Sequence, residues 1–178
     1  MKIRFIFLAI VFSTFLSCNN KHKSNTDIPA GWIKNPLPNG WIIYAPANFT
    51  CKPAQGIDSE PGYIYSSKDS IYLQFDSGRK MVKNEGCSLT DDFLKAKASV
   101  DIGFNKHFFY IGTTSVASID TIDNNIAIII KPFKDVTGTI NIQISDCGSG
   151  TWLDITGNNL SPLKQKLILK IFKTIRRN

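Results

Sequence analysis

The sequence predicts an α+β domain in which an antiparallel sheet is covered by an amphipathic C-terminal helix. Three observations lead to this class. Strand-like segments recur about every ten residues, between turn residues, in the second half of the chain. One of them, Thr139–Ile144, alternates apolar and polar residues, and the segment Ser161–Ile175 repeats apolar residues at spacings of three and four. Residues 28–178 match the size of one ordinary domain.

The first half of this domain is expected to form a strand and a hairpin. Trp41–Tyr44 is a run of β-branched and aromatic residues that Pro46 stops. Tyr63–Tyr65 and Ile71–Phe75 flank a polar turn at Ser66–Ser70, and this arrangement predicts a β-hairpin.

The second half predicts a meander of four strands, because short polar turns separate successive strand-like segments. The segments are Val116–Ile122, Ile126–Phe133, Thr139–Ile144 and Trp152–Ile155. In the third segment Ile140, Ile142 and Ile144 should face the core, while Asn141 and Gln143 face solvent. The continuous apolar run Ile126–Ile130 predicts the central strand, covered on both faces.

Two segments predict helices. Thr90 can cap a short helix over Asp91–Ala98, whose two leading acids favour a helix N-terminus. The C-terminal helix should begin with Ser161 as N-cap and Pro162 in the first turn. Its apolar arc contains Leu163, Leu167, Ile168, Ile171, Phe172 and Ile175, and its opposite side contains Lys166, Lys170, Lys173, Arg176 and Arg177. The basic side is either a solvated face or a surface that also meets anionic lipid headgroups.

The beginning of the chain has the pattern of an export signal. Met1–Arg4 is positively charged, and the apolar run Phe5–Phe12 is shorter than the about 20 residues that a membrane-spanning helix needs. Leu16-Ser17-Cys18 resembles the bacterial lipobox. The resemblance implies cleavage before Cys18 and acylation of this residue, palmitate included.

These features divide the chain into a signal peptide at 1–17, a lipidated cysteine and polar tether at 18–27, and a globular domain at 28–178. We expect the lipid anchor to hold the domain on the outer membrane, facing the periplasm. The formal charge of +7 falls to +5 when Lys2 and Arg4 leave with the signal. Nucleic-acid binding would need this excess gathered in a patch with aromatic platforms and does not suit an exported lipoprotein, so we expect anionic lipid or an acidic partner and no nucleic acid.

The order of elements resembles the PsbP-like α/β/α sandwich, in which a strand and a hairpin lead to a meander closed by a helix. The resemblance is based on Trp41–Pro46 with Phe49, on Ile126–Phe133 and Thr139–Ile144, and on Leu160–Ile175. It implies an accessory or binding role more often than catalysis, and it names no ligand.

Three cysteines remain after Cys18. Cys87 and Cys147 each adjoin a glycine in a predicted turn, so we expect a disulfide between them in an oxidising compartment. Cys51 would then be a buried, inert thiol. A redox pair, or a metal site with His107, is the alternative, although no C-x-x-C spacing occurs.

Gly56–Gly62 is the most site-like loop, because it joins Asp58 and Ser59 to glycines between two strands. The hairpin should return Asp76 to its side, so Gly56, Asp58, Ser59 and Asp76 form the predicted ligand loop. The alternative is turn chemistry, in which Asp and Ser side chains bond their own backbone.

The sequence contains neither a glycine-rich phosphate-binding loop nor a G-x-S-x-G nucleophile elbow. Ser149 in Gly148-Ser149-Gly150 does not fit the elbow motif. We therefore expect a non-enzymatic, cofactor-free lipoprotein that binds a small ligand or an envelope protein. One alternative is a hydrolase built on Asp58, Asp76 and His107. Another is an immunity or inhibitor lipoprotein that blocks a toxin or a lytic enzyme.

Overall fold

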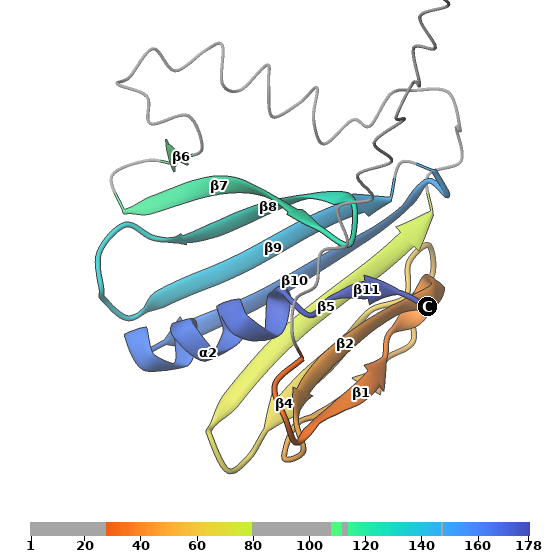
Figure 1. Cartoon of the computed structure of the whole chain (residues 1–178), viewed down its shortest axis with the longest axis horizontal. Coiled ribbons are helices and arrows are strands. Elements are labelled where there is room, and N and C mark those ends of the chain that lie inside the picture. The colour runs from red at the N-terminus through yellow and green to blue at the C-terminus, as the bar shows by residue number, and fades with distance from the viewer. Residues whose placement is uncertain (1–27, 80–107, 112–113, 147) are drawn as a thin grey trace, which may run out of the picture.

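The computed structural model describes residues 28–79, 108–111, 114–146 and 148–178. Within these ranges the chain forms two antiparallel sheets and one α-helix (Figure 1), which confirms the α+β class. The small sheet has the order β1 (Trp32–Pro36), β2 (Trp41–Pro46) and β11 (Arg176–Arg177), with the short 3-10 turn η1 (Pro38–Gly40) between β1 and β2. The predicted helix at 91–98, Cys18, His107, Cys87 and Cys147 lie outside the described residues.

The large sheet has eight strands. In spatial order they are β3 (Thr50–Pro53), β4 (Gly62–Ser66), β5 (Ile71–Arg79), β10 (Thr151–Leu160), β9 (Gly138–Asp146), β8 (Asn125–Pro132), β7 (Ser115–Ile122) and β6 (Phe108–Ile111). The predicted hairpin is β4–β5, and the predicted meander runs from β7 through β8 and β9 to β10. The two halves join where β10 pairs with β5.

The position predicted for the run Ile126–Ile130 is wrong. The two middle strands are β9 and β10, and β8 lies third from the β6 edge. Ala127 and Ile129 of β8 belong to the core, whereas on its other face Ile128 is buried and Ile126 and Ile130 are half-buried. A continuous apolar run thus indicates that both faces of a strand are at least partly buried, but it does not determine the position of the strand in the sheet.

One face of the large sheet is covered by α2 (Pro162–Phe172) and by the small sheet (Figure 1), and the core lies between these layers. Ile140, Ile142 and Ile144 of β9 are fully buried there, as predicted. Asn141 and Gln143 on the opposite face are half-buried, not freely solvated.

Helix α2 begins after Ser161 with Pro162 in its first turn, as predicted, but the Ser161 side chain makes no capping hydrogen bond. The predicted apolar arc is wrong at its start, because Leu163 is 80 % exposed. Gln165 occupies the buried position instead and donates to the carbonyls of Leu160 and Val136, both at 2.7 Å. These bonds satisfy an amide that would otherwise be costly to bury.

The helix also ends earlier than the periodicity indicates, at Phe172. Thr174 Oγ1 donates to the carbonyls of Ile171 and Tyr44, at 2.7 and 2.8 Å, and accepts the N–H of Tyr44. The chain is thereby turned into β11, which pairs with β2. In the described part of the chain, no helix combines the length and the hydropathy needed to cross a bilayer.

Candidate functional site

The large sheet has a second face, which neither α2 nor the small sheet covers. Side chains alternate along each strand, so residues adjacent to the core positions point to this second face. Cross-strand register places Tyr63 opposite Gln74, Gln74 opposite Thr156, and Asp76 opposite Asp154. We call this set, together with Tyr72, the tyrosine–aspartate face: Tyr63, Tyr72, Gln74, Asp76, Asp154 and Thr156. A hollow of about 340 Å³, within the size range of small-ligand sites, is lined by all of these residues except Tyr72.

The two carboxylates are directly opposed in the β5–β10 register. Like charges at opposed positions destabilise an antiparallel pair, so this arrangement works against the sheet. Each carboxylate is held by neutral donors. Asp76 accepts hydrogen bonds from Ser59 Oγ at 3.0 Å and from the N–H of Ser77 at 2.9 Å, and Asp154 Oδ1 accepts from Asn141 Nδ2 at 2.9 Å and Thr156 Oγ1 at 3.2 Å. The result is a pair of fixed, ionisable acceptors at one point of an open face.

Two tyrosines lie on the same face of the sheet. Tyr63 pairs with Gln74, in the row next to the two carboxylates, and Tyr72 lies four residues before Asp76 on β5. The rings of Tyr63 and Tyr72 are 5.1 Å apart between centroids and tilted by 32°, and the residues are 36 % and 52 % exposed. Desolvation, a side-chain hydrogen bond with Tyr63 that favours the protonated phenol, and the charge of Tyr63 raise the pKa of Tyr72 above its usual value. Further along β10, Trp152 lies across Gly78, where an added Cβ would fall 2.9 Å from the indole. The glycine therefore provides the space for this ring.

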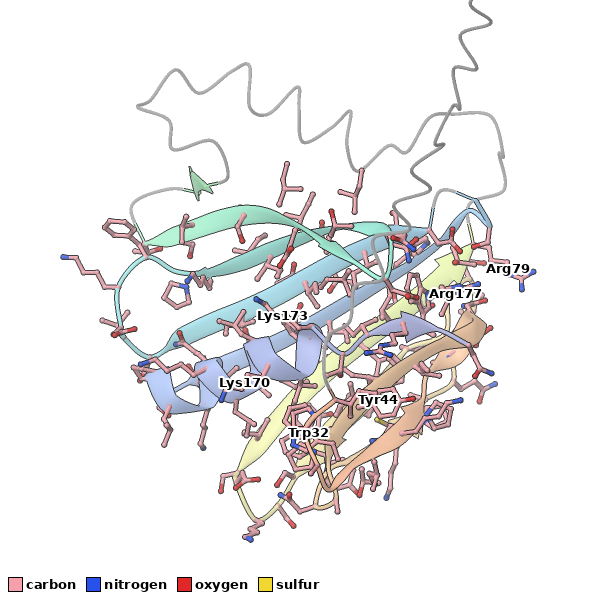
Figure 2. The ribbon with its side chains drawn as sticks, viewed as in Figure 1. Trp32, Tyr44, Arg79, Lys170, Lys173 and Arg177 are labelled. Carbon is pink, nitrogen blue, oxygen red and sulfur yellow. The ribbon has the colours of Figure 1, made fainter. Side chains whose placement is uncertain are left out.

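The structure brings together part of the predicted ligand loop. Ser59 bonds Asp76, and the N–H of Glu60 donates to the carbonyl of Ser77 at 2.7 Å. A second hollow of about 720 Å³ adjoins this point, and its lining includes the exposed residues Asp58 and Arg79, the latter labelled in Figure 2. Gly56 has a structural role, because a Cβ there would fall 2.1 Å from the Ser59 carbonyl. Turn chemistry and ligand-facing groups thus coexist in this loop.

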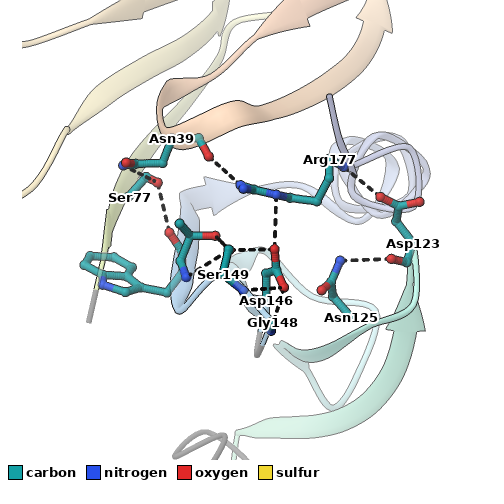
Figure 3. Close-up of polar contacts among 10 residues, drawn as sticks. Asn39, Ser77, Asp123, Asn125, Asp146, Gly148, Ser149 and Arg177 are labelled. Atoms are coloured by element: carbon teal, nitrogen blue, oxygen red, sulfur yellow. Dashed lines mark hydrogen bonds and ion pairs between the residues drawn. The ribbon is translucent and has the colours of Figure 1, made fainter. Parts of the chain in front are cut away.

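A polar cluster at the C-terminal end was not predicted from the sequence (Figure 3). Arg177 forms an ion pair with Asp146 at 3.3 Å, donates through its side chain to the carbonyl of Asn39, and donates its N–H to Asp123 Oδ2 at 2.7 Å. Asn39 Nδ2 in turn donates to Ser77 Oγ at 3.2 Å. The cluster ties β11 to the turns of both sheets.

Ser149 belongs to this cluster and is not an activated nucleophile. Its Oγ donates to Asp146 Oδ2 at 2.6 Å, and its N–H donates to Oδ1 of the same carboxylate at 3.2 Å. Burial alone would raise the pKa of Asp146, but the hydrogen bonds from Ser149 and Gly148 and the charge of Arg177 outweigh it and lower the pKa. The Gly148-Ser149-Gly150 segment is therefore a turn closed on a carboxylate.

Cys51 is free and half-buried, packed against the core. Burial raises the pKa of its thiol to about 12, so the reactive thiolate is disfavoured. The inert thiol expected from the sequence agrees with this environment. Nothing in the described residues bears on the predicted Cys87–Cys147 pairing, since both residues lie outside them.

In the ranges that the structure describes, no group of three or more His, Cys, Asp or Glu side chains is placed to hold a metal ion. Asp76 is the one member of the tyrosine–aspartate face that was predicted as a site residue, and its partner Asp154 was missed. A signal for it exists in the alternation Trp152-Asp154-Thr156, which sets one polar row opposite the buried residues of β10. No protein-family model matches the chain, and no curated protein is significantly similar to it.

Proposed function

We propose that the protein is a non-enzymatic, lipid-anchored module that binds a glycan on its tyrosine–aspartate face. The observation that supports this most directly is the opposed pair Asp76 and Asp154, which shares a hollow with Tyr63 and a sheet face with the exposed ring of Tyr72. Aromatic rings offer a flat apolar surface to the C–H face of a sugar ring. Carboxylate oxygens accept hydrogen bonds from hydroxyl groups, two or more at a time.

The fixation of these groups favours a polyhydroxylated ligand. Both carboxylates are oriented by Ser, Thr and Asn donors, so neither is neutralised by an ion pair in the described part of the chain. Gln74 and Thr156 stand in the next row and add further donors and acceptors. Ordered acceptors of this kind lose little entropy when they bind, which favours specificity for a ligand with several hydroxyl groups.

The cellular setting of the proposal comes from the sequence. The leader and the lipobox-like Leu16-Ser17-Cys18 support an acylated Cys18, with the domain on the periplasmic face of the outer membrane. The polar residues 19–27 would serve as a tether that leaves the domain free to meet envelope glycans. A glycan of the cell envelope is the ligand class that this setting supplies.

Binding of the purified protein, with Cys18→Ser to remove the proposed anchor, is measured on a panel of immobilised glycans and then by titration calorimetry. Asp154→Asn and Tyr72→Ala should each weaken binding about tenfold, the effect of losing roughly 1.4 kcal/mol. Asp135→Asn and Phe133→Ala are matched controls on the exposed β8–β9 connection and should bind normally. Thermal unfolding of every variant checks the fold.

Other outcomes would redirect the function. Absence of glycan binding, or equal losses in the site variants and the controls, refutes the glycan proposal. Shortened glycan products, abolished by Asp76→Asn, would support the hydrolase alternative based on Asp58, Asp76 and His107. Capture of one envelope or toxin protein, abolished by Tyr72→Ala, would support the partner-binding or inhibitor alternative.

A further inference from the structure

A groove lies on the opposite face of the molecule, between α2 and strands β7 and β8. Among the described elements, helix α2 packs mainly on β9, β10 and β2, and the outer strands β8 and β7 continue the large sheet beyond it (Figure 1). The groove has a volume of about 860 Å³. This size falls in the range of small-molecule sites.

The groove has an apolar floor. Ile129 of β8 and Leu169 of α2 line it, and the register places Ser118 of β7 opposite Ile129 on the same face of the sheet. Ile129 is buried and Leu169 is half-buried. A ligand that lies along this floor would cover apolar surface that is now incompletely shielded from water.

Three lysines line the same groove: Lys131 near the end of β8, Lys170 on α2 and Lys173 at the C-cap of α2. Figure 2 labels the two lysines at the helix. Lys170 and Lys173 are three residues apart on the helix surface and are both exposed. In the described part of the chain none of the three forms an ion pair. The α2 segment contains no acidic residue that could neutralise them.

Asp120 is the carboxylate on the groove lining. Its Oδ1 accepts the N–H of Thr121 at 2.8 Å, so the carboxylate is directed at its own backbone. The lining therefore has three positive charges against one negative charge, around an apolar floor. This distribution is complementary to a ligand with one anionic head and one apolar chain.

We propose that this groove binds a single free amphiphile of the fatty-acid class. Its hydrocarbon chain would lie along Ile129 and Leu169, and its carboxylate would meet the ammonium groups of Lys131, Lys170 and Lys173. Long lysine stems add apolar contact along the chain while their charged ends reach the head. This site is separate from the tyrosine–aspartate face and does not depend on glycan binding.

Dodecanoate, kept below its critical micelle concentration, is the probe, and binding to the purified Cys18→Ser protein is measured by titration calorimetry. One molecule should bind per protein, and dodecyltrimethylammonium should not bind. Lys170→Gln with Lys173→Gln should weaken binding about tenfold, because two of the three cations that face the carboxylate are lost. Asp120→Asn should tighten binding.

The matched control is Lys134→Gln with Lys166→Gln, which removes the same charge from exposed positions that do not line the groove. It should bind dodecanoate normally, as should Asp154→Asn on the other face. Equal weakening by both double variants would overturn the proposal, since it would show a diffuse charge effect. Absence of monomer binding, or binding only to anionic vesicles, would also overturn it, the latter in favour of a membrane-contact surface.

Discussion

Replacement of Ile171 by alanine should lower the free energy of unfolding by about 3 kcal/mol. Ile171 is fully buried on α2, whose neighbours include strands of both sheets. The truncation removes three carbon atoms, which at about 0.8 kcal/mol per buried methylene correspond to roughly 2.4 kcal/mol of transfer free energy. The cavity left in the core adds to this loss, and the higher helix propensity of alanine returns about 0.4 kcal/mol.

Leu163→Ala is the matched control, because it removes an equal number of carbon atoms from the same helix. Leu163 is 80 % exposed, so its truncation should change the free energy of unfolding by no more than about 0.5 kcal/mol. Urea unfolding, followed by tryptophan fluorescence and circular dichroism, measures both variants. The comparison is valid where the denaturant slope stays equal to that of the parent protein.

The contrast between the two variants tests the orientation of α2. A loss in Leu163→Ala that equals the loss in Ile171→Ala would show that the apolar arc expected from the sequence is the packed one. An Ile171→Ala loss below about 1 kcal/mol would place Ile171 outside the well-packed core. Either result would refute the assignment of the buried helix face.

Three further predictions concern charge and cysteine chemistry. The pKa of Asp146 is lower in the folded than in the unfolded state, so the ionised carboxylate stabilises the fold above the unfolded-state pKa, and this contribution is lost as the pH falls through the folded-state pKa. Asp146→Asn should therefore make the stability less sensitive to acid below about pH 4. Thermal unfolding across pH measures this effect. Cys18→Ser should move the protein from the detergent to the aqueous phase on phase separation, and unchanged partitioning would contradict the lipid anchor. Peptide mass spectrometry without reduction should find Cys87 linked to Cys147, whereas a free thiol at either residue would contradict the pairing.

The meander was predictable because each of its strands has a local signal. Asp123 and Asn124 adopt positive φ values of 51° and 62°, as the two central residues of a tight hairpin turn do, and both residue types tolerate this conformation. The isoleucines of β9 alternate with polar residues over the whole strand. Turn residues and apolar–polar alternation are patterns of a few neighbouring residues, so they can be recognised without knowledge of the tertiary structure.

The small sheet was only partly predictable, for the opposite reason. Only β2 was expected, because β1 contains Lys34, Asn35 and Pro36, and β11 has two residues, both arginines. These short edge strands form because β2 provides partners on both sides.

The candidate site also depends on long-range pairing that has no local sequence signal. Asp76 and Asp154 meet only through the β5–β10 pairing, which no local pattern specifies.

Residues 32–46 and 174–177 complete the small sheet together, and this has a consequence for the order of folding in the cell. Thr174 bonds Tyr44 across 130 positions of sequence, and Arg177 reaches Asn39 across 138. A nascent chain emerging from its N-terminus cannot finish this layer until its last segment is available, because β2 lacks β11 and the core lacks α2 until then. Contacts of such long range form slowly. The chain would therefore complete its fold only after its last residues have been synthesised.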